Sequence, residues 1–490
     1  MTFIFSRKNH KRRRLSSSSF QGTRKRKSIQ YSKKKGLLPE LTNWNQIEQT
    51  IINNYYPPQK FPISENLKIN SKIKKLIDIQ IKDYHSVSKK ELIETLRFLF
   101  KNYKCFLFFS IRNNNIHGYY IYNVYYRNSW HHNLKTNDGS SFDQFFKKYN
   151  HMVGKRNPKS EIGVSDRDTW YSNNCVLKTS DQWYFREGPA QQYINGFLEM
   201  LNFTKTQYGS LPDCDFVINR MDFPLIKKDK TPSYQNLYST SLKDNSQPDK
   251  LWFLCSQSKT REHLDIVIPN SDDWDNLSKL QEQEYNQIWE SKKNTAIWRG
   301  GATGCETTVK KNPRLWYTYL SSQINKKVSS PSDYVIDIKI NKPVTRLKVN
   351  QGVISYLNQR ELPFRIDKRF TVNMKDQSNC KYIFNIEGNV SAYRYGTLFA
   401  TKSLIINVKS DYYLWFEPLL TTEEIMTFPK NISKSQLRGK LQTLIKDDPH
   451  SKKIAESGYN FFKKYINKKK ISQYWFYLLV NFNNKQNKRK

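Results

Sequence analysis

The sequence has 490 residues, of which 37% are hydrophobic and 14% aromatic, so the chain is long enough to bury the cores of two or three domains. Lys and Arg number 82 against 43 Asp and Glu, and the net charge of +39 favours anionic partners such as nucleotide sugars, nucleic acid or acidic membranes. The alternative, which the abundance of Lys, Asn, Ile and Tyr favours, is the compositional bias of an AT-rich genome. The six cysteines are far apart and form no Cys-x-x-Cys pair, which argues against a zinc site and against a dense disulfide framework.

The N-terminal segment is basic and lacks acids. Residues 1–38 contain three clusters of Lys and Arg and a run of four serines, which predicts a disordered arm. Such an arm fits a nuclear-localisation or nucleic-acid tail, or simply a solvated terminus. The first apolar residues are too few for a signal peptide, and four charges interrupt the apolar segment 92–111, so we expect no membrane span and a cytoplasmic location.

The first half of the chain predicts a mixture of strands and helices. Residues 105–111 and 119–126 are apolar runs around an Asn- and Gly-containing loop, the pattern of a β-hairpin. A helix is expected over 191–201, with strands over 215–219 and 251–255.

From residue 275 onward, strands and helices alternate. A polar helix is expected over 275–292, and strands and helices then follow in turn. The expected strands are 296–298, 334–340, 381–386 and 404–408, with helices over 313–324 and 392–401. This alternation predicts βα units, a parallel sheet and an α/β fold. Three amphipathic helices close the chain, over 434–446, 449–465 and 470–482.

A glycine-rich loop follows the strand that ends near residue 299. Its backbone amides could approach an anion closely, its hydroxyls could add donors, and its arginines could hold a diphosphate. The loop is not a Walker motif, because no Lys-Ser/Thr follows the last glycine. A surface turn with an incidental arginine is the alternative. The candidate residues are Arg299, Gly300, Gly301, Thr303, Gly304 and Arg314.

A second loop connects the strand 381–386 to the next helix. It contains Gly388, then Ser391 as the expected helix cap, then Arg394 in the expected first turn. A cation near a helix N-terminus opposes the helix dipole, and a bound anion would resolve that conflict. Glu387 could instead neutralise Arg394.

A third loop follows the strand 215–219 and contains Asp222, ahead of Phe223 and Pro224. A carboxylate past a strand end could accept a proton from a hydroxyl group. The alternative is a structural pair with Arg220. Asp213 and Asp215 precede the strand or begin it, and we expect them to face away.

Four segments together resemble glycosyltransferase family 90, the protein O-glucosyltransferase and capsule-associated family. They are residues 211–224, 298–301 and 381–403, followed by 454–462 with Tyr474 and Trp475, in the family's order. The similarity covers roughly residues 174–479. The extension 303–308 and the basic N-terminus look most like family members of large DNA viruses, for which host cytoplasm or the virion would be the location.

The resemblance implies two Rossmann-like lobes of the GT-B type, with C-terminal helices that cross back. It implies an acceptor-side lobe over 39–285, a nucleotide-sugar lobe over 286–450, closing helices over 451–483 and a basic tail over 484–490. Asp222 matches the family's catalytic base, and UDP-sugar-binding positions are matched by Arg299, Gly300, Gly301, Ser391 and Arg394.

By this resemblance the chain would transfer glucose or xylose from a UDP-sugar to a hydroxyl on a protein or glycan, with inversion. The UDP-sugar would be a substrate, with no cofactor and no metal. The sequence departs from the family at Gly301, where Ser is common, and at 421–429, so sugar and acceptor stay open. The rival hypotheses are an inactive family member that serves as a scaffold and a basic nucleic-acid-binding or virion-associated protein on a degenerate transferase scaffold.

Overall fold

The computed structural model describes residues 44–53, 55, 57–62, 69–84, 88–103, 105–122, 135–136, 177–179, 182–183, 189–230, 248, 250–280, 285–304, 306–342, 348–350, 353–355, 357 and 361–487. Contacts divide the chain into residues 1–38 and 39–490. The basic arm expected over residues 1–38 lies outside the described residues, as do the last three residues of the expected basic tail.

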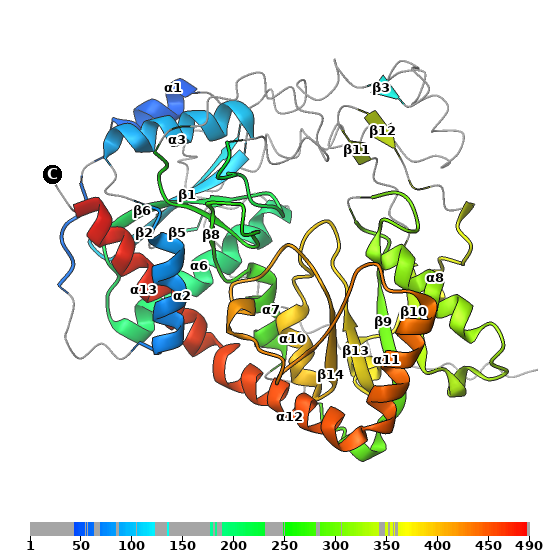
Figure 1. The fold of residues 1–490 in the computed structure, drawn as a ribbon. Helices are drawn as coiled ribbons and strands as arrows, with labels where there is room; N and C mark the ends of the chain where they lie inside the picture. The colour runs from blue at the N-terminus through cyan, green and yellow to red at the C-terminus, as the bar shows by residue number, and fades with distance from the viewer. Residues whose placement is uncertain are drawn as a thin grey trace, which may run out of the picture. The chain divides into compact units, whose positions relative to one another are not determined.

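The first sheet has seven strands in the order β5-β4-β2-β1-β6-β7-β8 (Figure 1). Only β6, β7 and β8 are parallel, and the other neighbours are antiparallel, so the sheet is mixed. β1 and β2 form the expected hairpin, which turns at Asn113 and Asn114 with φ of 48° and 65°. Asparagine tolerates this left-handed conformation better than most residues. The strands are β1 (Cys105–Arg112), β2 (Asn115–Tyr122), β4 (Leu177–Thr179), β5 (Gln182–Trp183), β6 (Cys214–Asn219), β7 (Leu254–Ser256) and β8 (Ile266–Val267).

Helices from both ends of the chain pack around this sheet. The C-terminal helix α13 contacts α6, α2 and β6, while α3 contacts β1 and α2 contacts β8. Ser88 and Glu91 form a capping box that starts α3, which explains the sharp beginning of that helix. The helices are α1 (Trp44–Ile47), α2 (Ser71–Ile81), α3 (Lys89–Asn102), α6 (Pro189–Tyr208), α7 (Ser271–Leu280) and α13 (Lys468–Asn487), with a π-helical turn η1 (Glu48–Ile52).

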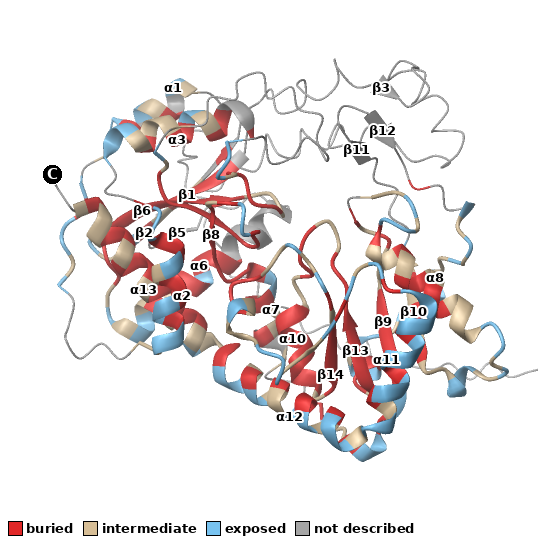
Figure 2. Ribbon diagram, in the orientation of Figure 1, coloured by how far each residue is buried: buried red, intermediate tan, exposed pale blue. Residues whose placement is uncertain are grey.

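The second sheet has five strands in the order β10-β9-β13-β14-β15, and all of its neighbours are parallel. β13 is buried along its whole length, as expected for a strand covered on both faces (Figure 2). Contacts join α8 to β10, α8 to α11 and α12 to β14. The elements are β9 (Lys293–Gly301), α8 (Pro313–Asn325), β10 (Ile336–Lys342), α9 (Met374–Gln377), β13 (Cys380–Asn385), α10 (Tyr395–Leu398), β14 (Leu404–Val408), β15 (Met426–Phe428), α11 (Lys434–Lys446) and α12 (Asp448–Tyr465).

Two expected helices differ from the structure. The polar helix expected over 275–292 ends at Leu280 within α7, and the chain then forms a 3-10 turn, η4 (Trp289–Ser291), before β9. The helix expected over 392–401 is only α10 and a 3-10 turn, η8 (Phe399–Thr401). The remaining short elements are a small sheet of β11 (Lys348–Asn350), β12 (Val353–Ser355) and β3 (Lys135–Thr136), and the 3-10 turns η5 (Pro331–Asp333), η7 (Lys368–Phe370) and η9 (Glu417–Leu419).

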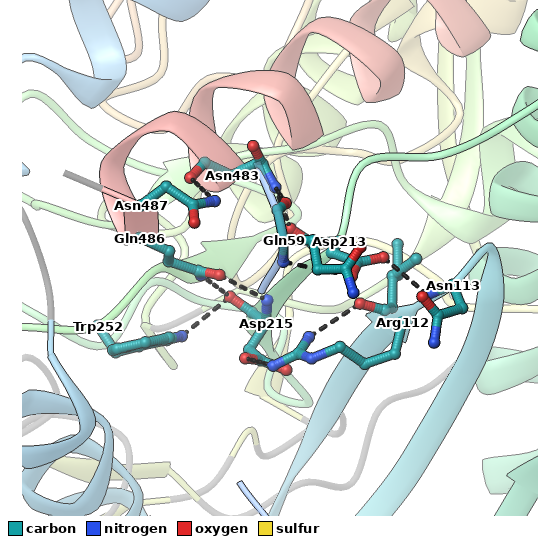
Figure 3. A network of polar contacts seen from close by, with 10 residues as sticks. Gln59, Arg112, Asn113, Asp213, Asp215, Trp252, Asn483, Gln486 and Asn487 are labelled. Carbon is teal, nitrogen blue, oxygen red and sulfur yellow. Dashed lines mark hydrogen bonds and ion pairs between the residues drawn. The ribbon is translucent and has the colours of Figure 1, made fainter. Parts of the chain in front are cut away.

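The end of α13 is anchored on the first sheet by polar side chains (Figure 3). The Gln486 side chain accepts a hydrogen bond from Asp215 N at 3.1 Å and donates to Asp215 O at 2.7 Å, so it pairs with β6 as a strand would. Asn483 donates to Asp213 O at 2.7 Å. The Asp215 carboxylate forms a buried ion pair with Arg112 at 2.5 Å. Asp213 and Asp215 are therefore committed to this anchor.

No helix in the described part of the chain is long and apolar enough to cross a membrane. Burial instead concentrates on the two sheets and the faces of the helices that cover them (Figure 2).

Candidate active site at the ends of the parallel strands

The strand order of the second sheet locates the candidate site. β9 lies between β10 and β13, so the connections from β9 and β13 leave toward opposite sides of the sheet. In open parallel sheets of this order, ligands bind at such a switch point, beyond the carboxyl ends of the strands. The loops that leave β9 and β13 there are residues 302–312 and 386–394, which contain half of the ten predicted site residues.

Arg299 does not lie at this edge as a free cation. Its Nη2 atom forms an ion pair with the Asp337 carboxylate, and both side chains are largely buried. In the β9–β10 ladder, Arg299 stands opposite Lys339, whereas Asp337 stands opposite Ile297. The guanidinium therefore reaches back along the sheet, away from the carboxyl ends. The predicted binding of a diphosphate by Arg299 stays a prediction, and in this arrangement its guanidinium is already paired with Asp337.

Gly300 serves the packing of a neighbouring side chain. A Cβ atom at Gly300 would lie 2.6 Å from the Trp298 ring, a distance that side chains do not tolerate. Trp298 is fully buried, and the guanidinium groups of Arg314 and Arg394 lie over its indole ring. The glycine thus allows the ring to fold back over the end of β9.

Arg314, at the start of α8, holds the two loops together. Its Nη1 atom donates to Gly301 O at 3.0 Å and also to the Thr303 hydroxyl. Its Nε atom donates to Glu387 O at 2.9 Å, and its Nη2 atom donates to Ile386 O at 3.1 Å. Most of its donors are therefore already bonded, so Arg314 acts first as a structural clamp across the switch point.

The second loop approaches this clamp closely because it has no side chain at Gly388. A Cβ atom there would lie 2.8 Å from Thr303 Oγ1 and 3.1 Å from Arg314 Nη2. Gly304 N adds a hydrogen bond of 3.1 Å to Asn389 Oδ1, a cross-loop contact that the sequence did not suggest. The glycines are therefore needed for loop packing, with Gly301 and Gly304 as backbone partners in it.

Arg394 forms no ion pair among the described residues, although it lies close to Arg314. Its guanidinium carbon lies 5.6 Å from the centre of the Trp298 ring, and that of Arg314 lies 5.2 Å from the same ring. Within the part of the chain that the structure describes, no carboxylate forms an ion pair with Arg394. Glu387 pairs instead with Lys430 at 2.8 Å, so the expected alternative of a Glu387–Arg394 pair is not realised.

The electrostatics of this pair favour an anion. Burial lowers the pKa of Arg394 to about 10. Burial first, and then the charge of Arg394, lower the pKa of Arg314 to about 9, while Glu387 opposes the shift. Both groups remain cationic at neutral pH. An anion between them would replace lost solvation and relieve their repulsion.

Ser391 does not cap a helix. The N-cap of α10 is Arg394, and the helix is only four residues long. A helix of four residues lacks the run of aligned peptide groups that an anion site at a helix N-terminus requires. The Ser391 hydroxyl is buried and has no hydrogen-bond partner among the described residues. The positive charge of this site therefore comes from arginine side chains rather than from a helix dipole.

Asp222 is brought to the same place from the other half of the chain. Tyr393 Oη donates to Asp222 O at 2.7 Å, and Ser258 Oγ donates to the same carbonyl at 3.0 Å. Asp222 is half-buried, and its carboxylate makes no ion pair, with Arg220 or otherwise, within the described residues. The carboxylate is therefore available to accept a proton.

The loop that contains Asp222 is rigidly held. Met221 N donates to Asn219 Oδ1 at 2.8 Å. The Asp265 carboxylate accepts from Leu225 N at 2.7 Å and from Ile226 N at 2.9 Å. The backbone on both sides of Asp222 is thus bonded to buried side chains.

Sequence reasoning missed several residues that shape this site. Asp337 and Lys430 determine which cation stays free, and Tyr393 joins the two halves. Only Tyr393 had a local signal, because it adjoins Arg394. No three His, Cys, Asp or Glu side chains of the described segments gather as a metal site would require. Metal independence stays a prediction.

Comparison with known proteins identifies the family of this chain. Residues 190–489 match the model of glycosyl transferase family 90. Uncharacterized protein 179R of Invertebrate iridescent virus 6 is 24% identical over 87% of this chain and 40% of its own length. Protein O-glucosyltransferase 1 of Homo sapiens is 25% identical over 56% of this chain and 63% of its own length.

The chain thus spans 40% of the viral relative and somewhat under two thirds of the human one. Among solved structures, that of the GtfA/B complex aligns with a TM-score of 0.32 at 9% identity over 63% of each chain. That likeness is too low to support an argument. The family match covers well over half of the sequence, and the chain therefore belongs to glycosyl transferase family 90.

Proposed function

We propose that this protein is an inverting glycosyltransferase that transfers glucose or xylose from a UDP-sugar to a hydroxyl group of a protein or glycan. The proposal rests mainly on two side chains that form no ion pair among the described residues, Arg394 and Asp222. Tyr393, next to Arg394, donates a hydrogen bond to the backbone of Asp222 and so brings their loops together. The Asp222 carboxylate would supply the negative charge that accepts a proton, and the Arg394 guanidinium the positive charge that binds the diphosphate. Family membership supports glycosyl transfer, and the similarity to human protein O-glucosyltransferase 1 supports glucose.

In the proposed mechanism, Asp222 accepts the proton of the acceptor hydroxyl as its oxygen attacks the anomeric carbon. The bond between that carbon and the diphosphate oxygen breaks, and its electron pair leaves with UDP. Arg394 neutralises the charge that develops on the diphosphate, with the loops held by Arg314. Attack from the face opposite the leaving group inverts the anomeric configuration. The proton on Asp222 then passes to solvent.

The same proposal assigns the halves of the chain. Residues 39–285 would form the acceptor-side lobe and residues 286–450 the nucleotide-sugar lobe of a GT-B enzyme. The mixed first sheet and the parallel second sheet support this division. The contacts of α13 with α6 and α2 support closing helices that return to the first lobe.

Substitution of the proposed base tests the assignment directly. Asp222→Asn should lower transfer from radiolabelled UDP-glucose or UDP-xylose by about 10²- to 10⁴-fold, the usual contribution of a general base. UDP binding, measured as a thermal shift, should persist because the amide leaves the diphosphate site intact. Asp333→Asn, at an exposed 3-10 turn, is the control and should retain full activity. Full activity of Asp222→Asn would exclude Asp222 as the base.

The rival assignment is binding of nucleic acid by a degenerate transferase scaffold, suggested by the net charge of +39. It predicts DNA affinity that falls steeply with salt and no thermal shift with UDP. The transferase proposal requires the reverse, a shift with UDP that survives physiological salt.

A further inference from the structure

We infer that Tyr393 is a positioning residue that couples occupancy of the diphosphate site to the placement of Asp222. The inference rests on the proposed function, because it assumes that Arg394 binds the diphosphate and that Asp222 is the base. It adds a direct route by which donor binding organises the acceptor side.

The Asp222 carbonyl is held from both halves of the chain. Ser258, in the loop after β7, donates to it from the same half at 3.0 Å. Tyr393, in the loop after β13, donates to it from the other half at 2.7 Å across 171 residues of sequence. Because the carbonyl and the carboxylate share one residue, fixing the carbonyl also restricts where the carboxylate can point.

Tyr393 is also tied to the diphosphate site, because it directly precedes Arg394. Ala392 O accepts a hydrogen bond of 2.9 Å from Tyr395 N, so the two residues occupy the middle of one tight turn. The side chains diverge from this turn, Arg394 toward Trp298 and Tyr393 toward Asp222. Any movement of the backbone when Arg394 takes an anion therefore reaches Tyr393 through a single peptide bond.

The hydrogen bonds that Ser258 and Tyr393 donate to the Asp222 carbonyl should therefore differ in what their loss does to the protein. Loss of the Ser258 bond loosens Asp222 whether or not the donor site is filled, because both partners belong to the same half. Loss of the Tyr393 bond removes the contact through which the donor loop acts. Tyr393→Phe deletes only the hydroxyl, and Ser258→Ala is its matched control at the same carbonyl.

Kinetics supply the first test. Tyr393→Phe should lower kcat about 3- to 10-fold, the range expected for one net hydrogen bond, with KM for the UDP-sugar within about twofold of wild type. A rise in KM at constant kcat would overturn the positioning role, because it would make Tyr393 a donor-binding residue. An unchanged thermal midpoint would show that the variant folds normally.

Hydrogen exchange with and without UDP supplies the second test, followed on peptides that cover residues 219–226 and 386–394. In wild type and in Ser258→Ala, UDP should slow exchange in both segments. In Tyr393→Phe, protection should persist at 386–394 and be lost at 219–226. Equal protection of 219–226 in Tyr393→Phe and wild type would overturn the inference alone. Failure of UDP to protect 386–394 in wild type would overturn the proposed function and, with it, the inference.

Discussion

The two ends of the five-stranded parallel sheet differ in whether all of their described cations have partners. Toward the amino ends of the strands, Arg299 forms an ion pair with Asp337, and Lys292 donates to Ser378 O, Thr401 O and Ser403 Oγ at 2.7–2.9 Å. At the carboxyl ends, Lys430 pairs with Glu387 and Arg314 donates to backbone carbonyls. Arg394, however, lies over an indole ring there with no carboxylate partner in the described segments.

Whether a cation has partners indicates its role. Cations with partners stabilise the fold, and a cation without a carboxylate partner is available for a ligand. A buried charge with all of its partners in place holds neighbouring strands together, and removing one partner is destabilising. A buried charge without a partner loses solvation on folding, and a bound anion would compensate that loss. The sequence contains both kinds of arginine within one hundred residues, and only their partners distinguish them.

The largest expected effect is on stability, at the amino end. Arg299→Met should lower the free energy of unfolding by about 3 kcal/mol, because Asp337 stays largely buried with only Lys339 to compensate it. Denaturant titration measures the loss. The double variant with Asp337→Leu should recover most of it, since an apolar pair replaces a buried ion pair. If Arg299→Met is as stable as wild type but binds UDP more weakly, Arg299 binds the donor and is not mainly a structural residue.

Arg394→Ala should show the converse behaviour. We expect UDP affinity to fall about 10- to 100-fold, or about 1.4–2.8 kcal/mol, with little change in stability because no partner is orphaned. Calorimetric titration with UDP measures the affinity. Arg438→Ala, on the exposed face of α11, is the matched control and should bind UDP normally. If Arg394→Ala instead unfolds the protein, the contrast between the two ends fails.

Lys292 gives a smaller, pH-dependent effect. Burial lowers its pKa from 10.5 to about 8, so between these values the unfolded chain binds more protons than the native one. Unfolding free energy should therefore rise with pH across that window, relative to a Lys292→Met variant that lacks the group. Chemical denaturation at pH 7 and pH 9.5 measures the difference between the two proteins. A pH-independent difference would contradict the burial of a charged ammonium.

Chelation should have the smallest effect. If arginine side chains supply the positive charge at the diphosphate, transfer measured with excess EDTA should equal transfer measured with Mg²⁺. A loss of activity in EDTA that Mg²⁺ restores would show that the carboxyl end recruits a metal in addition to Arg394.

Much of the fold follows from local patterns. The apolar run that became β14 and the helices α11 and α12 lie close to where their periodicity predicts them. The βα alternation after residue 293 predicted the parallel sheet. The helix expected at 392–401 was wrong in its extent, because it begins only at Tyr395 and its last turn is a 3-10 turn that ends at Lys402 in a left-handed conformation.

The sequence predicted which loops form the site, but not which ion pairs and hydrogen bonds their side chains make. Glycines and polar residues at strand ends mark residues 299–304, 388–394 and 222 by local chemistry alone. Whether Arg299 or Arg394 stays free depends on a carboxylate 38 residues away in the next strand, whose register is a property of the assembled sheet. The Tyr393–Asp222 contact spans 171 residues. Sequence by itself determined the elements and the candidate groups, and the tertiary structure decided which charges are satisfied, because pairing depends on distances that only the packed fold defines.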